Sequence, residues 1–276
     1  MNTPIAIAFS TDDNYAPYTS TAIFSLIKNR DRQKAYSVFV FYTCLSQANI
    51  SLLSMLQTDN VSIHFVNIES YLGEYNDLFY TRAHYSKESY YRFFMPGCLG
   101  KAFDYVVYLD DDLIVNCDIS NILFKIDRNK TINGVLNYST QRVSRRLQTL
   151  NLSYKSYINA GVLVINCKRF EKLGYFSKAM ECIANHRNLA CIDQDVLNII
   201  CKGDIGLLEP SWNIQWHNLN NLPNLEVDIV KLISNLPNPR IIHYTSDKKP
   251  WNCSLNSYGD FYVKYASQNP IYKRFF

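Results

Sequence analysis

The sequence predicts an α/β protein with a doubly wound, mostly parallel sheet that is flanked by helices in a single domain. Three observations support this fold class. Strand-like and helix-like segments alternate from the N-terminus, the strand-like segments are short apolar runs, and polar clusters follow several of these runs. The chain has 276 residues, which is enough for one large domain with a short helical tail.

The first half of the sheet is predicted from three strands and two helices. Pro17 begins a helical segment that ends near Lys28, and Ser46 is a typical N-cap residue for a second helix. The β-strand–α-helix alternation predicts parallel strands joined by right-handed crossovers. The three strands, each rich in β-branched or aromatic residues, are expected at 5–9, 38–42 and 61–66.

The second half is less regular. Residues 68–85 have no clear periodicity, and a segment of this length inside an α/β domain is typical of a lid or a binding loop. Ser86 is expected to cap a helix that ends near Phe94. Further strands are expected at 105–109, 134–136, 161–165 and 240–244, and further helices at 170–188, 193–201 and 227–236.

Composition excludes several classes of protein. A net charge of +4 with no dense run of Lys and Arg argues against nucleic-acid binding, and 47% hydrophobic residues argue against general disorder. The sequence shows neither a signal peptide nor the ~20 apolar residues of a spanning helix, which predicts a cytoplasmic protein. Eight cysteines without a Cys-x-x-Cys pair fit small core residues in a reducing compartment.

Three consecutive aspartates, Asp110 to Asp112, follow the apolar run at 105–109. Ligands in open α/β sheets bind beyond the carboxyl ends of strands. If strand geometry continues, Asp110 and Asp112 point the same way and can share one divalent cation such as Mg²⁺ or Mn²⁺. The alternative is a surface turn, in which Asp is common.

Four other polar clusters also lie at predicted strand ends or helix starts. Each cluster also has a structural alternative. In chain order, the alternatives are a helix N-cap, a strand start, a second N-cap and a solvated loop. Their order along the chain and their placement at strand ends favour a shared site over four separate accidents. The clusters are Asp12-Asp13-Asn14-Tyr15, Asn159-Ala160-Gly161, Asp193-Gln194-Asp195, and the stretch from His243 to Trp251.

As a set, these motifs resemble those of glycosyltransferase family 8, which includes bacterial lipopolysaccharide galactosyl- and glucosyltransferases. The resemblance extends from Ile5 to about Trp251. It implies a Rossmann-like GT-A fold in a domain spanning 1–251, followed by a tail at 252–276. It also implies transfer of glucose or galactose from a UDP-sugar to a glycan or lipid-linked glycan, with the α-configuration retained.

The resemblance implies a role for each matching residue. Asp110, Asp112 and His243 would hold Mn²⁺, with Mg²⁺ as the alternative. Arg92, Asp193 and Gln194 would take part in catalysis, and Gln194 would face the anomeric carbon. An amide is a weak nucleophile, which favours front-face substitution over a covalent intermediate, with Asp193 as the alternative nucleophile. Substrate contacts are implied for Asp12, Asp13, Asn14, Tyr15, Arg92, Asp111, Asn137, Asn159, Ala160, Gly161, Asp193, Gln194, Ser246 and Lys249.

The sequence departs from the family pattern at three positions. Ser246 and Asp247 stand where many relatives have Gly and Pro, and Asn137 stands where Asp is common. These departures leave two other functions open: a non-catalytic protein that binds sugar nucleotides, and a metal-dependent phosphohydrolase. The tail spaces aromatic residues three or four apart, from Tyr258 to Tyr265, and ends in basic and aromatic residues. Either it docks as a helix onto the domain or it makes a weak peripheral contact with the cytoplasmic face of the inner membrane.

Overall fold

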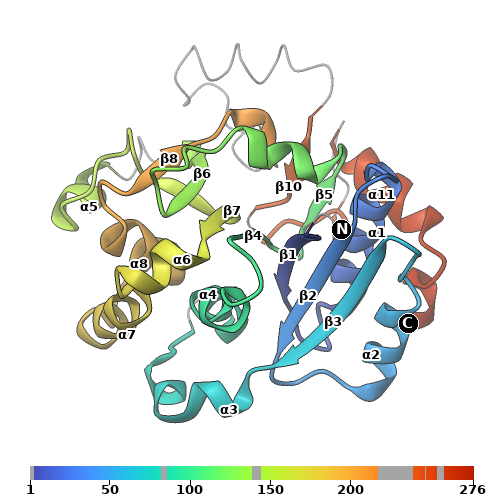
Figure 1. Ribbon diagram of the computed structural model, residues 1–276, viewed down its shortest axis with the longest axis horizontal. Helices are drawn as coiled ribbons and strands as arrows, with labels where there is room; N and C mark the ends of the chain where they lie inside the picture. The colour runs from blue at the N-terminus through green and yellow to red at the C-terminus, as the bar shows by residue number, and fades with distance from the viewer. Residues whose placement is uncertain (1–2, 82–85, 139–143, 217–238, 246, 254–257) are drawn as a thin grey trace.

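A seven-stranded sheet in the order β3-β2-β1-β4-β7-β6-β8 forms the centre of the molecule (Figure 1). The computed structural model describes residues 3–81, 86–138, 144–216, 239–245, 247–253 and 258–276. The helix predicted at 227–236 therefore lies outside the described residues. The strands are β1 (Ile5–Ser10), β2 (Tyr36–Tyr42), β3 (Val61–Asn67), β4 (Tyr105–Leu109), β6 (Ile132–Leu136), β7 (Ile158–Asn166) and β8 (Ile205–Leu207).

The prediction of a mostly parallel sheet is confirmed. β3, β2, β1 and β4 run parallel to one another, and β6 runs parallel to β8. β7 is the exception, because it pairs antiparallel with both β4 and β6. Its interior residues are buried on both faces, as in a central parallel strand, so its apolar sequence does not reveal its direction.

A second sheet of three short strands brings distant segments of the chain to the same end of the large sheet. Its strands are β5 (Leu113–Val115), β10 (Ile241–His243) and β9 (Ile214–Gln215). β10 pairs antiparallel with β5, and His243 is in register with Leu113. His243 is also in register with Gln215 on β9. This pairing holds His243 beside the aspartate triplet, which immediately precedes β5.

Helices cover the large sheet, and their bounds correct parts of the sequence prediction. The helix predicted at 170–188 is two helices, because Gly174 adopts φ +64° between them. The segment after Ser86 is a 3-10 helix, and part of the predicted 68–85 loop is helical. The longer helices are α1 (Ala16–Asn29), α2 (Gln47–Ser54), α7 (Tyr175–Asn185), α8 (Ile192–Ile200) and α11 (Gly259–Gln268). The short ones are α3 (Glu69–Leu72), α4 (Met95–Leu99), α5 (Ser144–Thr149), α6 (Cys167–Lys172) and the 3-10 helices η1 (Gly73–Leu78), η2 (Lys87–Phe93), η3 (Ile119–Phe124), η5 (Pro210–Trp212) and η7 (Tyr272–Phe275).

The C-terminal tail docks onto the domain, which confirms the first of the two alternatives for it. α11 lies beside α1, and Tyr262 and Tyr265 are buried in the same core cluster as the strands (Figure 1). The Tyr265 hydroxyl donates to Asn116 Oδ1 over 2.8 Å. Tyr262 and Tyr265 are therefore covered by protein, whereas Tyr258 and Phe261 of the same tail are half-buried.

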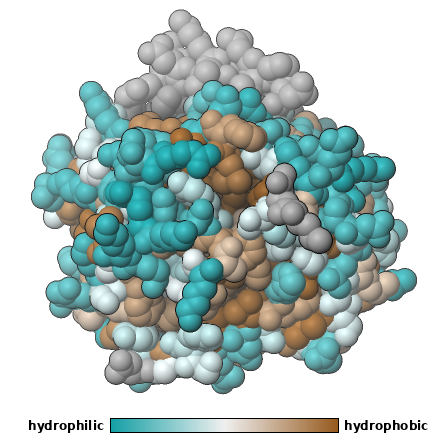
Figure 2. Space-filling view, viewed as in Figure 1, coloured by the Kyte–Doolittle hydropathy of each residue, from teal (hydrophilic) through white to brown (hydrophobic). Residues whose placement is uncertain are grey.

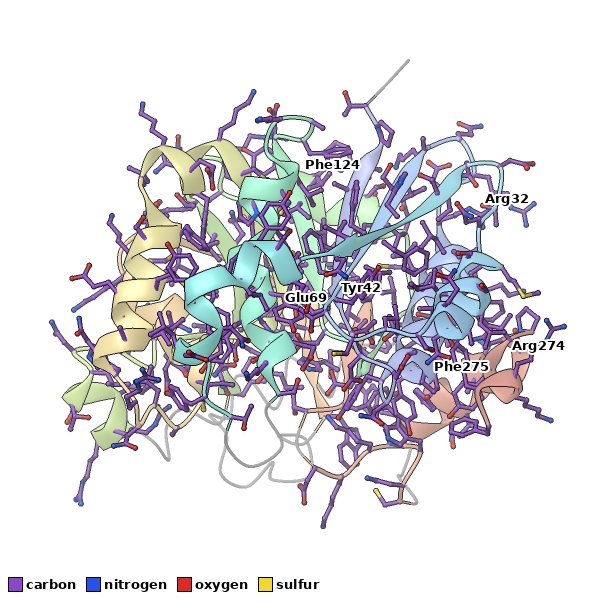
Figure 3. All side chains as sticks on the ribbon, turned by 90° about the horizontal axis from the view of Figure 1, so that it is seen from below. Arg32, Tyr42, Glu69, Phe124, Arg274 and Phe275 are labelled. Carbon is purple, nitrogen blue, oxygen red and sulfur yellow. The ribbon has the colours of Figure 1, made fainter. Side chains whose placement is uncertain are left out.

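The basic end of the tail remains at the surface. Lys273, Arg274 and Phe276 are exposed, and Figure 3 shows Arg274 at the outer edge of the molecule. Within the described residues, no helix has the length and apolar character needed to cross a membrane. Figure 2 shows one face of the molecule with hydrophilic residues around its edges and hydrophobic residues gathered toward the middle.

Candidate active site

A cleft of about 360 Å³ opens beyond the carboxyl ends of β1 and β4, where ligands of α/β sheets bind. The structure brings together most of the residues predicted for the site, although they come from seven separate parts of the sequence. Those that line the cleft are Asp12, Tyr15, Arg92, Asp110, Asp111, Asp112, Asn137, Asn159, Ala160, Gly161, Asp193, Gln194, His243 and Lys249.

Three predicted residues are not among those lining this cleft. The Asp13 carboxylate accepts hydrogen bonds from Ser46 N–H (2.8 Å) and Asn49 Nδ2 (2.7 Å), so it holds the start of α2 in place. Asn14 is exposed and its amide donates to Asp12 over 3.3 Å, which places it beside the cleft. Ser246 lies outside the described residues. Asp13 therefore has a structural role that its sequence context alone did not reveal.

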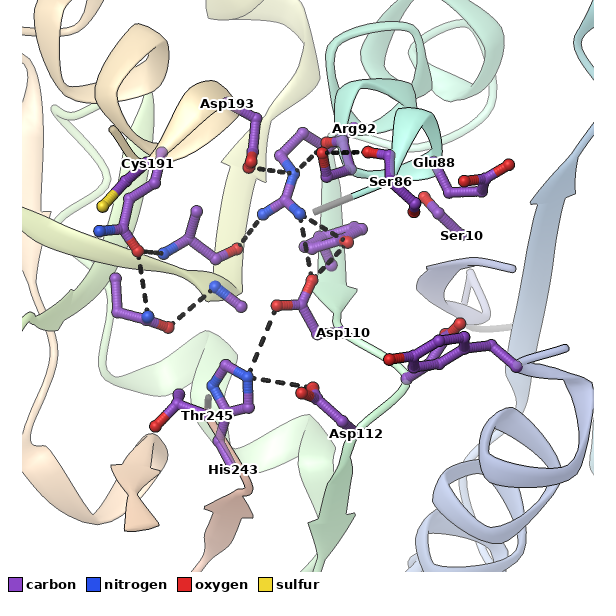
Figure 4. A pocket seen from close by; sticks show the side chains of 18 of the residues that line it. Ser10, Ser86, Glu88, Arg92, Asp110, Asp112, Cys191, Asp193, His243 and Thr245 are labelled. Carbon is purple, nitrogen blue, oxygen red and sulfur yellow. Dashed lines mark hydrogen bonds and ion pairs between the residues drawn. The ribbon is translucent and has the colours of Figure 1, made fainter. Parts of the chain in front are cut away.

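Asp110, Asp112 and His243 form a compact candidate metal-ligand group (hereafter the metal-ligand group) at the floor of the cleft (Figure 4). One ligand atom from each lies within 4.8 Å of the others. His243 Nε2 is 3.1 Å from Asp112 Oδ1 and 3.6 Å from Asp110 Oδ2. Two carboxylates and one imidazole are a donor set that suits Mn²⁺, and also Mg²⁺ to a lesser degree.

The bonding around this group fits a cation. Asp112 Oδ1 is buried and accepts no hydrogen bond from the described residues. His243 Nδ1 faces Asn213 Oδ1 at 3.0 Å and therefore carries a proton, so in the neutral ring Nε2 is the atom that directs a lone pair at the two carboxylates. Electron pairs that face one another in a buried site are costly unless a cation lies between them.

Other orphaned polar atoms lie around the same cleft. Ser10 Oγ, Asp111 Oδ1 and Thr245 Oγ1 are buried without a hydrogen-bond partner among the described residues, and all three residues line the cleft. Buried polar groups in folded proteins are nearly always bonded, so such a concentration indicates a ligand site.

Gly161 on β7 passes directly behind the metal-ligand group. A Cβ atom at this position would lie 2.1 Å from His243 Cε1 and 2.6 Å from Asp110 Oδ2. Any side chain here would collide with two of the three residues of this group. The glycine is therefore required by the close approach of the backbone.

Arg92 on η2 connects the metal-ligand group to the far wall of the cleft (Figure 4). Its side chain is 4% exposed and its guanidinium is 3.1 Å from Asp110 Oδ1 and 3.1 Å from Asp193 Oδ2. It also donates to the Tyr108 hydroxyl over 3.0 Å, and that hydroxyl donates to Asp110 Oδ1 over 2.6 Å. Asp110 is thus held in a fixed orientation by two donors.

Asp193 is the partner of Arg92 on α8 and is almost fully buried. Burial raises the pKa of its carboxyl to about 6, and the charge of Arg92 opposes that rise. The Arg92 Nε atom that contacts Asp193 also donates to the Ser89 carbonyl over 2.7 Å. The Asp193 carboxylate is therefore held in an ion pair.

Gln194 points into the cleft from the next position of α8, and its amide is bonded at both ends. Its Oε1 accepts from Asn159 Nδ2 at 3.0 Å and from Ala160 N–H at 3.2 Å. Its Nε2 donates to the Tyr157 hydroxyl over 3.0 Å. These contacts fix the amide in one orientation toward the space beside the metal-ligand group.

At the opposite end of the cleft, Asp12, Tyr15 and Asp111 form a polar and aromatic wall. Asp12 accepts from the Tyr15 N–H over 2.8 Å. Burial, together with the charges of Asp112 and Asp111, raises the pKa of Tyr15, so its phenol stays neutral. Burial likewise raises the pKa of Asp111 well above its usual value. The Tyr15 ring packs edge-on against Trp251, with ring centres 6.4 Å apart.

Lys249 brings a buried positive charge to the same end. Its ammonium donates to Asp112 Oδ2 and, over 2.8 Å, to the Tyr244 carbonyl. Burial alone would raise the pKa of Asp112, but Lys249 and, after it, His243 outweigh burial and hold that pKa well below its usual range. The Asp112 carboxylate is therefore ionised and available to a cation.

Sequence reasoning missed several residues of the site. Tyr108 was assigned to the core of β4, although its hydroxyl reaches Asp110, and Asn213 carried no motif at all. A hydroxyl-bearing residue two positions before an aspartate on the same face of a strand is a signal that could have identified Tyr108. The other cleft residues that were missed are Ser10, Thr11, Ser86, Glu88, Ser89, Cys191, Gln215 and Thr245.

Comparison with known proteins places this architecture among the GT-A glycosyltransferases. The profile of glycosyl transferase family 8 matches residues 6–254. General stress protein A of Bacillus subtilis (strain 168) is 26% identical over 270 residues, which cover 95% of this chain and 92% of that protein. The lipopolysaccharide 1,2-glucosyltransferase of Escherichia coli (strain K12) is 24% identical over 276 residues, covering 97% of this chain and 78% of that protein.

A solved structure shows the same fold. The apo structure of the bifunctional glycosyltransferase WbbM superimposes with a TM-score of 0.86 at 27% identity. The match covers 99% of this chain and 52% of WbbM, so this chain spans about half the length of that protein.

Proposed function

The chain belongs to glycosyl transferase family 8, and from this premise we propose that it is a retaining hexosyltransferase. It would transfer glucose or galactose from a UDP-sugar to a hydroxyl group of a glycan and would form an α-linkage. The observation that carries the proposal is the group of Asp110, Asp112 and His243, whose possible ligand atoms lie within 4.8 Å of one another inside the cleft and include the unpartnered Asp112 Oδ1.

These three residues would hold Mn²⁺, or Mg²⁺ in its place. When bound, the ion would neutralise charge on the diphosphate and stabilise the departing UDP. Tyr108 and Arg92 keep Asp110 oriented for this role through their contacts with its Oδ1 atom. Lys249 would add a positive charge for the diphosphate once it is released from Asp112.

The nucleoside would lie at the opposite end of the cleft. Tyr15 offers a neutral aromatic ring on which a base can stack. Asp12 offers a carboxylate for the polar edge of the base, and Asp111 offers an orphaned oxygen for a ribose hydroxyl. Asn137, Asn159 and Ala160 would line the sugar pocket between this end and Gln194.

The bonding of Asp193 and Gln194 favours front-face substitution. Gln194 Oε1 already accepts two hydrogen bonds, and amide oxygens are weak nucleophiles. Asp193, the alternative nucleophile, is engaged by Arg92. We therefore assign Gln194 to orienting the sugar and stabilising positive charge on it. The departing phosphate would remove the proton from the acceptor hydroxyl.

The acceptor would be a lipopolysaccharide or a related lipid-linked glycan, by analogy with the Escherichia coli relative. Such an acceptor would place the protein at the cytoplasmic face of the inner membrane. Because Tyr262 and Tyr265 are buried, the exposed end with Lys273 and Arg274 is the candidate for a peripheral contact. Basic residues near an anionic surface contribute about 1 kcal/mol each, so the contact would be weak and sensitive to salt.

UDP release with and without a glycan acceptor, in Mn²⁺ and in EDTA, tests the proposal. A transferase releases UDP faster when acceptor is present, and chelation stops the release. Equal release with and without acceptor would indicate a phosphohydrolase, and binding of UDP-sugar without any release would indicate a non-catalytic protein. The anomeric proton of the product, observed by NMR, reports the linkage, and a β-linkage would contradict retention.

The membrane contact has a separate test. Sedimentation with anionic vesicles should fall when Lys273 and Arg274 are both replaced by Ala, and it should also fall at high salt. Wild-type protein that never sediments with such vesicles would remove this part of the proposal and leave the transfer activity unaffected.

A further inference from the structure

A chain of side-chain hydrogen bonds leads from His243 away from the metal-ligand group. His243 Nδ1 is 3.0 Å from Asn213 Oδ1, and Asn213 Nδ2 donates to Asn159 Oδ1 over 2.8 Å. Asn159 Nδ2 in turn donates to Gln194 Oε1 over 3.0 Å. The chain therefore joins a metal ligand on β10 to the residue that faces the proposed sugar pocket.

The chain continues beyond Gln194 and ends at a carboxylate. Gln194 Nε2 donates to the Tyr157 hydroxyl over 3.0 Å, and that hydroxyl donates to Asp195 Oδ1 over 2.5 Å. All the members of this chain are at most 8% exposed. Hydrogen bonds between groups this deeply buried are strong, and an unpaired member is costly.

Two backbone N–H groups determine which atom of each amide is the oxygen. Gly161 N–H donates to one atom of the Asn159 amide over 2.9 Å, so that atom must be Oδ1. The Asn213 atom that faces it must then be the donor, Nδ2, and the other end of Asn213 is an oxygen. His243 Nδ1 faces this oxygen and must carry a proton.

The same reasoning holds at the next amide. Ala160 N–H donates to Gln194 Oε1 over 3.2 Å, which identifies that atom as an acceptor. Asn159 must therefore present its Nδ2 to Gln194, in agreement with the assignment from Gly161. The direction of every bond from His243 to Gln194 follows from two main-chain donors on β7.

We propose that Asn213 is a positioning residue that holds His243 in the Nδ1–H tautomer, with the Nε2 lone pair directed toward Asp110 and Asp112. The proposal rests on the metal-dependent function proposed above. Outer partners of metal-bound histidines fix the ring and raise its basicity, and their loss typically weakens metal binding about 10–100-fold. Asn213 is 30 residues from His243 in sequence and is fully buried.

Mn²⁺ binding to the full chain, without donor, tests this inference by electron paramagnetic resonance of the free ion. Asn213→Ala should weaken Mn²⁺ binding about 10–100-fold. Asn213→Asp keeps an oxygen opposite His243 Nδ1 but loses the amide donor to Asn159 Oδ1, so it should bind Mn²⁺ more tightly than Asn213→Ala and more weakly than the wild type. Thermal unfolding checks that each variant is folded, and Asn213→Leu, which preserves the shape of the side chain, replaces the alanine variant if that variant does not fold.

Asn133→Ala is the matched control. Asn133 is also fully buried, and its amide also makes two hydrogen bonds, both to the backbone of Asp127. It should lose stability without losing Mn²⁺ affinity. Equal loss of affinity in the Asn133 and Asn213→Ala variants, or Mn²⁺ binding by Asn213→Asp that is no tighter than by Asn213→Ala, would overturn the inference.

His243→Ala separates this inference from the proposed function. If His243→Ala binds Mn²⁺ weakly while Asn213→Ala binds it normally, the metal site stands and the role of Asn213 is wrong. If His243→Ala binds Mn²⁺ as tightly as the wild type, the metal site itself is wrong.

Discussion

Gly161 and His243 approach each other so closely that a single methyl group on Gly161 would lie 2.1 Å from the imidazole Cε1 atom. Real Cβ atoms do not come this near to another heavy atom, so one of the two residues would have to move. His243 lies on a three-residue strand, β10, and its ring is the part that can turn. The geometry of the metal-ligand group thus depends on a residue that contributes no ligand atom to it.

Gly161→Ala should therefore impair metal binding. The displaced imidazole would no longer face Asp110 and Asp112, and we expect Mn²⁺ affinity to fall by roughly tenfold or more, in line with the loss of other groups that orient a ligand. Titration of Mn²⁺ followed by electron paramagnetic resonance measures the change. Gly97→Ala is the control, because a Cβ there would lie 3.5 Å from Glu171 Oε1, an ordinary contact.

Replacement of a metal ligand should have a larger effect. Asp112→Asn removes the negative charge of the carboxylate whose Oδ1 atom has no hydrogen-bond partner in the cleft. We expect UDP release to slow by roughly 100-fold or more, because losing even an outer partner of a metal ligand typically weakens metal binding or activity about 10–100-fold. Steady-state rates at saturating Mn²⁺ measure this loss. Asp104→Asn, at an exposed carboxylate paired with Lys168, should leave the rate unchanged. Undiminished activity of the Asp112 variant would contradict the site.

Loss of Arg92 should destabilise the protein. Arg92→Met would leave Asp110 and Asp193 without their shared cation in a buried setting, and breaking such a pair costs about 3–5 kcal/mol. Denaturant unfolding measures the difference in free energy. Lys168→Met removes a cation from an exposed pair with Asp104 and should change stability little. Similar stability of the two variants would show that Arg92 is solvated in the native state.

The raised pKa of Asp193 predicts a dependence of stability on pH. Burial raises this pKa from 3.8 to about 6, so the folded protein binds the proton more tightly than the unfolded chain does. Between about pH 4 and pH 6, the contribution of Asp193 to the free energy of unfolding should fall as the pH rises, by about 3 kcal/mol. Above about pH 6 the loss is complete.

Comparison with Asp193→Asn isolates this contribution, because the amide does not titrate. The free energy of unfolding of each protein is measured in EDTA between pH 4 and pH 7. As the pH rises, the value for the variant should increase relative to the value for the wild type. Parallel pH profiles for the two proteins would show that Asp193 does not bind the proton more tightly in the folded state.

The docked tail predicts a clear contrast within the last residues of the chain. Tyr265→Ala should cost about 3–5 kcal/mol, as for other buried aromatic residues, because its ring is 4% exposed and its hydroxyl contacts Asn29 and Asn116. Phe276→Ala should have almost no effect, because Phe276 is 78% exposed. Differential scanning calorimetry measures both. An unchanged melting temperature for Tyr265→Ala would contradict the docking of α11.

Local sequence was sufficient to predict the first four parallel strands and the polar residues of the cleft that directly follow β1 and β4. β1 to β4 are apolar runs flanked by turn residues, and their polar followers, such as Asp12 and Asp110, must gather at one edge once the strands are parallel. Whether a polar residue directly follows a strand can be read from the neighbouring sequence alone. This is why residues directly after β1 and β4 were predicted to belong to one site before any contact between them was known.

Tertiary structure decided what depends on pairing between distant segments. β7 has the apolar sequence of a buried strand, and only its neighbours fix its antiparallel direction. Asn213 carries no motif, and it meets His243 only because β9 and β10 pair in register. Aromatic spacing in α11 served a docked helix and a membrane helix equally well, because periodicity identifies an apolar face and does not identify what covers that face.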